Sequence, residues 1–160
     1  MTQLAQKCPE CGQESLVHTL RAESFEFDAG DCKVTVLAND VPVIKCIQCG
    51  EEYAGPDALR IRHDAVCEAL GYLPPAEYKR IREQNNWSQQ YLADLTGYGV
   101  ATVSRAERGR QLPNRNYDIT LRAIRDSIEY RNELMRQFHR RSTTNNPVSS
   151  TCDPVQLSSV

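Results

Sequence analysis

Residues 88–109 read SQQYLADLTGYGVATVSRAERG, and this stretch decides the fold of the C-terminal half of the chain. The pattern predicts two short helices, over residues 89–96 and about 100–108, joined by a turn that contains glycine. Ser88 is expected to cap the first helix, because its hydroxyl can accept a hydrogen bond from a backbone N–H at the helix start.

Three residues set how closely the two helices can meet. Ala93 is small enough for a helix crossing, Gly97 supplies the turn, and Val103 returns an apolar side chain to the core. The spacing Ala-x3-Gly-x5-Val is therefore typical of a helix-turn-helix. The alternative is a helical hairpin that has no DNA function.

The second helix is expected to enter the major groove of DNA. If Val100 and Val103 point inward, then Ala101, Thr102 and Arg105 lie on the outward side. Arg105 can donate two hydrogen bonds to guanine O6 and N7, and Thr102 can contact a base or a phosphate. Further contacts, to the sugar–phosphate backbone, are expected from Gln89, Gln90, Ser104, Arg108 and Arg110.

Helical patterns continue on both sides of this stretch. Residues 71–75 (GYLPP) mark a domain boundary, because paired prolines oppose helix continuation. One long helix is expected over residues 117–138, and its apolar positions offer a dimer seam. These positions include Ile124, Ile128, Leu134 and Met135. Residues 142–160 are rich in Ser, Thr, Asn and Pro and are expected to be a disordered tail.

Two Cys-x-x-Cys-Gly turns occupy the N-terminal half, at residues 8–12 and 46–50. Two such turns can present four thiolates tetrahedrally, which is the closed geometry of a structural zinc site. The predicted ligands of this single ion are Cys8, Cys11, Cys46 and Cys49. Iron also binds thiolates, and buried thiols or a redox pair are the alternatives to a metal. Because four thiolates leave no position for water, a catalytic metal is not expected.

The segment between the two turns predicts a small sheet. Alternating apolar residues indicate strands over residues 23–28, 32–37 and 41–45, with a hairpin turn at 29–31. A helix is expected over residues 56–70. The predicted fold class is therefore an α+β zinc-binding domain, with a small β-sheet plus a helix, joined to an all-α helix-turn-helix domain.

Charge divides the chain in the same way. Residues 1–72 hold 12 acidic and six basic side chains, whereas residues 73–141 hold eight acidic and 13 basic ones. We therefore expect a zinc-binding, partner-binding domain at 1–72, a DNA-binding and dimerisation domain at 73–141 and a tail at 142–160. The acidic and basic halves suggest two partners of opposite charge.

Composition also bears on the compartment. The seven cysteines are an odd number, and the chain starts without a signal-peptide pattern, so a reducing cytoplasm is expected rather than a disulfide framework. The sequence contains no run of 18 apolar residues, so we do not expect a membrane span.

These motifs together resemble the MqsA family of antitoxins over about residues 7–135. The resemblance lies in Cys8–Gly12, in Cys46–Gly50 and in Gly97–Gly109. It implies a structural zinc, a homodimer formed through the C-terminal domains, operator binding by the second helix, and an N-terminal domain that neutralises an mRNA-cleaving toxin. Ala101 departs from the polar Asn common in the family, so only Arg105 carries over as a base-reading residue.

Three functions follow as hypotheses. The preferred one is an antitoxin of a type II toxin–antitoxin system that also represses its own operon. The alternative is a stand-alone zinc-containing helix-turn-helix regulator without a toxin partner. An enzyme such as a nuclease is the least supported, because the sequence holds no carboxylate cluster, His pair or Ser/His/Asp grouping.

Overall fold

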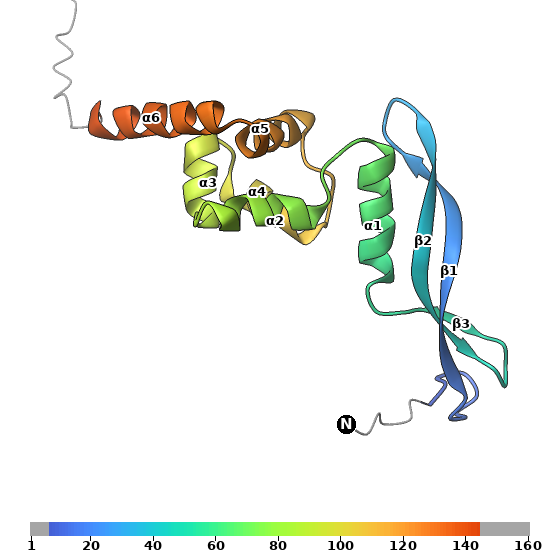
Figure 1. Ribbon diagram of the computed structural model, residues 1–160. Helices are drawn as coiled ribbons and strands as arrows, with labels where there is room; N and C mark the ends of the chain where they lie inside the picture. Colours follow the sequence, from blue (N-terminus) through green and yellow to red (C-terminus); the bar gives the residue numbers. More distant parts are fainter. Residues whose placement is uncertain (1–6, 145–160) are drawn as a thin grey trace, which may run out of the picture.

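The computed structural model describes residues 7–144 and shows a three-stranded antiparallel sheet followed by six helices (Figure 1). The strands are β1 (Leu16–Asp28), β2 (Lys33–Cys46) and β3 (Glu52–Ala54), in the order β1-β2-β3. The helices are α1 (Ala58–Ala69), α2 (Pro75–Gln84), α3 (Gln89–Thr96), α4 (Val100–Arg108), α5 (Arg115–Asp126) and α6 (Ile128–Thr144). This architecture confirms the predicted α+β half joined to an all-α half.

β1 and β2 form one long hairpin, which is longer than the sequence pattern indicates. The pairing runs from Asp28 opposite Lys33 to Leu16 opposite Cys46. The sequence pattern predicted this segment as two strands, over residues 32–37 and 41–45. Instead the strand passes through, with Asp40 at a φ of 55° and a shift of register between Arg21 and Glu23 on β1. A β-bulge absorbs the irregularity without ending the ladder.

α1 covers one face of this hairpin and forms the first hydrophobic cluster. Ala38 and Val41 of β2 and Ala58 of α1 are fully buried there, and Phe25, Ile61 and Ala65 pack against them. Arg62 ties the helix to β1 by donating from Nε and Nη2 to the Glu23 carboxylate, at 2.7 and 3.0 Å. The cluster is small, so a metal at the end of the hairpin would add substantially to its stability.

The helices after residue 73 enclose a second and larger hydrophobic cluster. Its members come from α2, α3, α4 and α5 and from Leu73 just before α2, and Leu134 of α6 packs against the cluster. The fully buried side chains include Tyr78, Ile81, Leu92, Val103, Tyr117, Leu121 and Ile124. Burial of this size stabilises the all-α half independently of any metal.

The single long helix predicted over residues 117–138 is wrong. Ser127 has an extended backbone, with φ −124° and ψ 115°, and divides the segment into α5 and α6. Its hydroxyl accepts a hydrogen bond from the Tyr130 N–H at 3.1 Å and so caps α6. Ile124 lies in the core before this break, and therefore it cannot contribute to a dimer seam.

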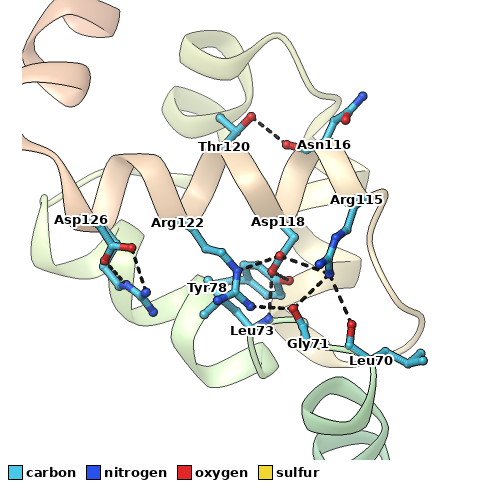
Figure 2. Close-up of polar contacts among 11 residues, drawn as sticks. Leu70, Gly71, Leu73, Tyr78, Arg115, Asn116, Asp118, Thr120, Arg122 and Asp126 are labelled. Atoms are coloured by element: carbon cyan, nitrogen blue, oxygen red, sulfur yellow. Dashed lines mark hydrogen bonds and ion pairs between the residues drawn. The ribbon is translucent and has the colours of Figure 1, made fainter.

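A polar cluster around Asp118 of α5 joins the two halves (Figure 2). Asp118 is fully buried, and its carboxylate accepts hydrogen bonds from the Leu73 N–H at 2.8 Å, the Tyr78 hydroxyl at 2.7 Å and Arg122 Nε at 2.8 Å. Arg115 and Arg122 each donate to the Gly71 carbonyl, at 3.0 and 2.9 Å. These contacts hold the C-terminal end of α1 and the linker against α5.

The C-terminal boundary of the last helix differs from the prediction. α6 includes residues 142–144, which we had assigned to a disordered tail, whereas the rest of that tail lies outside the described residues. In the described part of the chain, none of the helices combines the length and apolar character that crossing a membrane requires.

Candidate metal centre and candidate nucleic-acid interface

The two Cys-x-x-Cys turns lie at the same end of the β1–β2 hairpin. In each turn a glycine N–H bonds back to the carbonyl of the first cysteine, Gly12 to Cys8 at 2.8 Å and Gly50 to Cys46 at 2.9 Å. Both glycines have positive φ, 72° and 81°, which a side chain would disfavour. The Ile47 N–H donates to the Ser15 carbonyl at 2.9 Å and links the two turns.

The four thiols converge on one point. The Sγ atoms of Cys8, Cys11, Cys46 and Cys49 all lie within 4.8 Å of one another. Cys8 and Cys49 are 3.7 Å apart, and Cys11 and Cys46 are 3.6 Å apart. A tetrahedral zinc with Zn–S bonds of about 2.3 Å places its sulfurs about 3.8 Å apart. The cluster therefore fits one four-coordinate zinc ion.

Two hydroxyl groups support the sulfurs from outside, and the sequence analysis did not identify either. The Ser15 hydroxyl lies 3.1 Å from Cys46 Sγ, and the Tyr53 hydroxyl of β3 lies 3.5 Å from Cys8 Sγ. The Ser15 hydrogen bond lowers the pKa of the Cys46 thiol to about 6. The hydrogen bond from the Tyr53 hydroxyl likewise lowers the pKa of the Cys8 thiol. Donors of this kind orient metal-bound thiolates and stabilise their charge.

The other two thiols show why the cluster needs a cation. A hydrogen bond from the Glu51 backbone lowers the pKa of Cys49, but the neighbouring Cys46 and burial outweigh it and raise the pKa to about 12. The pKa of Cys11 is also raised. Four negative charges within this distance repel one another strongly. A dication that removes this repulsion makes all four thiolates available as ligands, so the donor set fits a structural zinc.

The α3–α4 pair occupies the positions that the sequence predicted. The Ser88 hydroxyl accepts from the Tyr91 N–H at 3.0 Å, which confirms the N-cap of α3. Gly97 ends α3 with a φ of 77°, and Ala93 and Val103 are buried where the helices meet. Gly109 ends α4 with a φ of 62°, and a Cβ there would lie 2.9 Å from Pro75 Cγ, so a larger residue is excluded.

The predicted DNA-contacting residues of α4 divide into an exposed set and a half-buried set. Ala101, Arg105 and Arg108 are exposed, as is Arg110 just beyond the helix, whereas Thr102 and Ser104 are half-buried. Val100, which we expected to point inward, is 42% exposed. It is the first residue of α4, where the helix has not yet entered the core. Arg105 folds back on its own helix, with Nε donating to the Ala101 carbonyl at 3.1 Å.

The two glutamines at the start of α3 already have intramolecular partners. Gln90 donates to Asp94 at 2.8 Å, and Gln89 donates to Glu107 of α4 at 2.8 Å. Glu107 also accepts from Arg82 Nε at 2.6 Å, and its side chain is only 4% exposed. This Arg82–Glu107–Gln89 network joins α2, α3 and α4. It holds α4 in a fixed orientation relative to the other two helices.

Large apolar side chains remain exposed on α5 and α6. Ile119 is 54% exposed, Ile128 is 60% exposed and Tyr130 is 42% exposed. These three residues are hereafter called the α5–α6 apolar patch. An apolar surface of this kind favours contact with another protein surface.

The comparisons with known proteins bear on the whole of this arrangement. Residues 6–135 of the chain match the model of one protein family, MqsA, which is described as the antitoxin component of bacterial toxin–antitoxin systems. The match covers both the four-cysteine cluster and the α3–α4 pair. No curated protein matches the chain.

Proposed function

The chain belongs to the MqsA antitoxin family, and from that premise we propose that it is the antitoxin of a type II toxin–antitoxin system that also represses its own operon. In this proposal residues 1–72 form a partner-binding domain and residues 73–141 form a DNA-binding and dimerisation domain. Both activities belong to the cytoplasm. The protein regulates by binding and catalyses no reaction.

The proposal for DNA binding is carried by the α3–α4 pair. The Arg82–Glu107–Gln89 network and buried Val103 hold α4 so that Ala101 and Arg105 face outward. In a helix-turn-helix this surface lies in the major groove. Arg105 would leave the Ala101 carbonyl and bond guanine, Thr102 would contact a base or phosphate, and the backbone contacts would come from Gln89, Gln90, Ser104, Arg108 and Arg110.

Dimerisation supplies the length of the DNA site. One helix-turn-helix reads only a few base pairs, whereas two related by a twofold axis read a palindrome with half-sites about 34 Å apart. We propose that the α5–α6 apolar patch forms the twofold interface, because a copy of the same surface would cover Ile119, Ile128 and Tyr130.

The N-terminal half is proposed to bind a toxin that cleaves mRNA. Its support is the family and the charge, since residues 1–72 carry twice as many acidic as basic side chains. An RNA-cleaving enzyme presents a basic surface, and an acidic partner would complement it. The zinc ion would hold the hairpin end rigid and would take no part in chemistry.

The test is co-expression of the full-length protein with the small open reading frame next to its gene. Copurification, together with rescue of growth and protection of the promoter from nuclease, would support both activities. Promoter binding without a toxic neighbour would instead favour the stand-alone regulator. Absence of promoter binding by the zinc-loaded dimer would refute the proposed repression.

A further inference from the structure

A groove lies between the two halves of the molecule, bounded by α1, by the start of α2 and by the end of α4. Figure 1 shows α1 standing beside one end of α2. The volume of the groove is about 940 Å³, and small-ligand sites typically measure about 300–1,000 Å³. We call it the α1–α4 groove and define it by six of its lining residues: Leu59, His63, Pro75, Lys79, Arg108 and Arg110.

Close contacts at the end of α4 hold the walls of the groove together. Gly109 ends α4, and a Cβ there would lie 2.9 Å from Pro75 Cγ of α2 and 3.4 Å from His63 Nδ1 of α1. The three helices therefore meet at Gly109. Its two neighbours in the chain, Arg108 and Arg110, are held at the groove by the same contacts.

The acidic side chains that line the groove already have basic partners. Arg60 Nε lies 3.4 Å from the Asp57 carboxylate, and its Nη1 lies 3.3 Å from that of Asp64. The Glu107 carboxylate accepts from Arg82 and is only 4% exposed. These carboxylates therefore do little to repel an anion in the groove.

The basic side chains at the end of α4 are available to a ligand. Within residues 7–144, neither Arg108 nor Arg110 makes a side-chain hydrogen bond or an ion pair, and both are exposed. Lys79 adds a third cation, and its ion pair with Glu83, at 3.7 Å, is exposed and weak. Guanidinium groups bind phosphate through charge-assisted hydrogen bonds, so this set of cations favours a phosphorylated ligand.

The remaining lining is mostly apolar, and it distinguishes between two sources of phosphate. Leu59 is 78% exposed at the groove, and Pro75 and Ala76 also line it. The sugar–phosphate backbone of DNA has no apolar group that would cover these side chains. A free organic phosphate of nucleotide size carries an anionic part and a less polar part, so it fits the groove better.

We propose that the α1–α4 groove binds a free organic phosphate of nucleotide size, whose phosphate groups contact Arg108 and Arg110 and whose less polar part lies against Leu59. The same two arginines are the proposed contacts to DNA phosphates, so the bound ligand and the promoter exclude each other. The ligand thereby relieves repression. This regulatory part rests on the proposed DNA binding, whereas ligand binding itself does not.

Calorimetric titration of the full-length, zinc-loaded protein without DNA tests the site. The probe is ADP, and pyrophosphate and adenosine are the controls that each carry one part of it. ADP should bind at least about 10-fold more tightly than either control, because only ADP meets both the cations and the apolar lining.

Three variants show whether ADP occupies the groove. Arg108→Ala/Arg110→Ala should weaken ADP binding by about 100-fold, which is about 10-fold for each charge-assisted contact. Leu59→Glu keeps both arginines but adds a carboxylate at the groove, so it should weaken ADP binding by about 10-fold or more. Its matched control, Leu20→Glu, changes a leucine of β1 that is 67% exposed and lies outside the groove, and it should bind ADP like the wild type.

Competition on the promoter duplex tests the regulatory part. ADP at ten times its own Kd should lower the affinity for the promoter by about 10-fold for each protomer, by mass action. Sodium chloride of equal ionic strength is the control, because DNA binding is itself sensitive to salt. In Leu59→Glu the same release should require more ADP.

The inference is overturned if the wild type does not bind ADP, if pyrophosphate binds as tightly as ADP, or if Leu59→Glu and Leu20→Glu bind ADP equally well. Promoter binding that ADP does not affect would overturn the regulatory part and leave the proposed repression intact. A wild type that binds ADP but not the promoter would refute the proposed function and support the ligand site alone.

Discussion

Removing the Asp118 carboxylate should destabilise the all-α half more than any exposed change to its helices. Asp118→Ala takes the acceptor away from three donors, the Leu73 N–H, the Tyr78 hydroxyl and Arg122 Nε. The first two donors are buried and would remain unsatisfied, at about 1–3 kcal/mol each. Arg122 is 35% exposed and water can hydrate it, so the loss of its hydrogen bond to Asp118 destabilises the protein less. We expect Asp118→Ala to lower the free energy of unfolding by about 3–5 kcal/mol in total.

Two further variants separate charge from shape. Asp118→Asn keeps one acceptor oxygen and the side-chain volume but loses the charge, so we expect a loss of about 1.5–3 kcal/mol. Tyr78→Phe should cost about 1 kcal/mol by itself. In the Asp118→Ala background, however, it removes a donor that has no acceptor, so the double mutant should be less destabilised than the sum of the single changes.

The pH dependence of this effect has a definite sign. Burial by itself would raise the pKa of Asp118, but the hydrogen bonds from Arg122, Leu73 and Tyr78 outweigh it and hold the pKa below its usual value. A lowered folded-state pKa stabilises the protein above the unfolded value of about 3.9, and this stabilisation is lost as the pH falls through the folded value. The difference between wild type and Asp118→Asn should therefore be full at pH 7 and shrink below about pH 4.

Urea unfolding followed by tryptophan fluorescence measures these effects, because Trp87 is the single tryptophan and packs against the core of the all-α half. The midpoint at pH 7 should fall in the order wild type, Asp118→Asn, Asp118→Ala. A loss of less than about 1 kcal/mol for Asp118→Ala at pH 7 would refute the reasoning, since it would mean that water satisfies the two buried donors.

Three other predictions concern the metal, the DNA and the dimer. Elemental analysis should give one equivalent of zinc for the wild type and none for Cys46→Ser, and this variant should unfold the sheet while its Trp87 fluorescence stays native. Retention of stoichiometric metal by the variant would contradict the ligand assignment. Arg105→Ala should reduce the affinity of the dimer for operator DNA by about two to four powers of ten, with little change in its affinity for scrambled DNA. Arg110→Ala should weaken binding to both kinds of DNA alike. Equal losses of affinity on both duplexes for Arg105→Ala would show that Arg105 contacts only the sugar–phosphate backbone of the DNA. Ile128→Glu should give a monomer in sedimentation experiments at micromolar concentration, because it places a charge in the α5–α6 apolar patch, and an unchanged dimer would place the interface elsewhere.

The parts of this protein that depend on short-range pattern could be predicted from the sequence. The Ser88 cap, the turn at Gly97 and the buried Val103 depend on spacing within one helix pair, and the structure places them as expected. The four cysteines could be grouped because Cys-x-x-Cys turns are local and a tetrahedral metal needs two of them.

Other features were predicted wrongly because local signals conflict. Ser127 can sit inside a helix or cap one, and only the packing of α5 into the core and of α6 along α3 selects the cap. Val100 has an apolar side chain at a helical spacing from Val103, yet it is exposed because α4 begins there.

The tertiary structure alone brings together groups that are far apart in the chain. Ser15 meets Cys46 and Tyr53 meets Cys8 across 31 and 45 residues, and Asp118 meets Leu73 and Tyr78 across 45 and 40 residues. Ser15, Tyr53 and Asp118 are each unremarkable in their own segments, and no periodicity marks them as functional. A hydrogen bond requires two groups within about 3 Å, and for partners this distant only the packing of the helices and the sheet determines that distance.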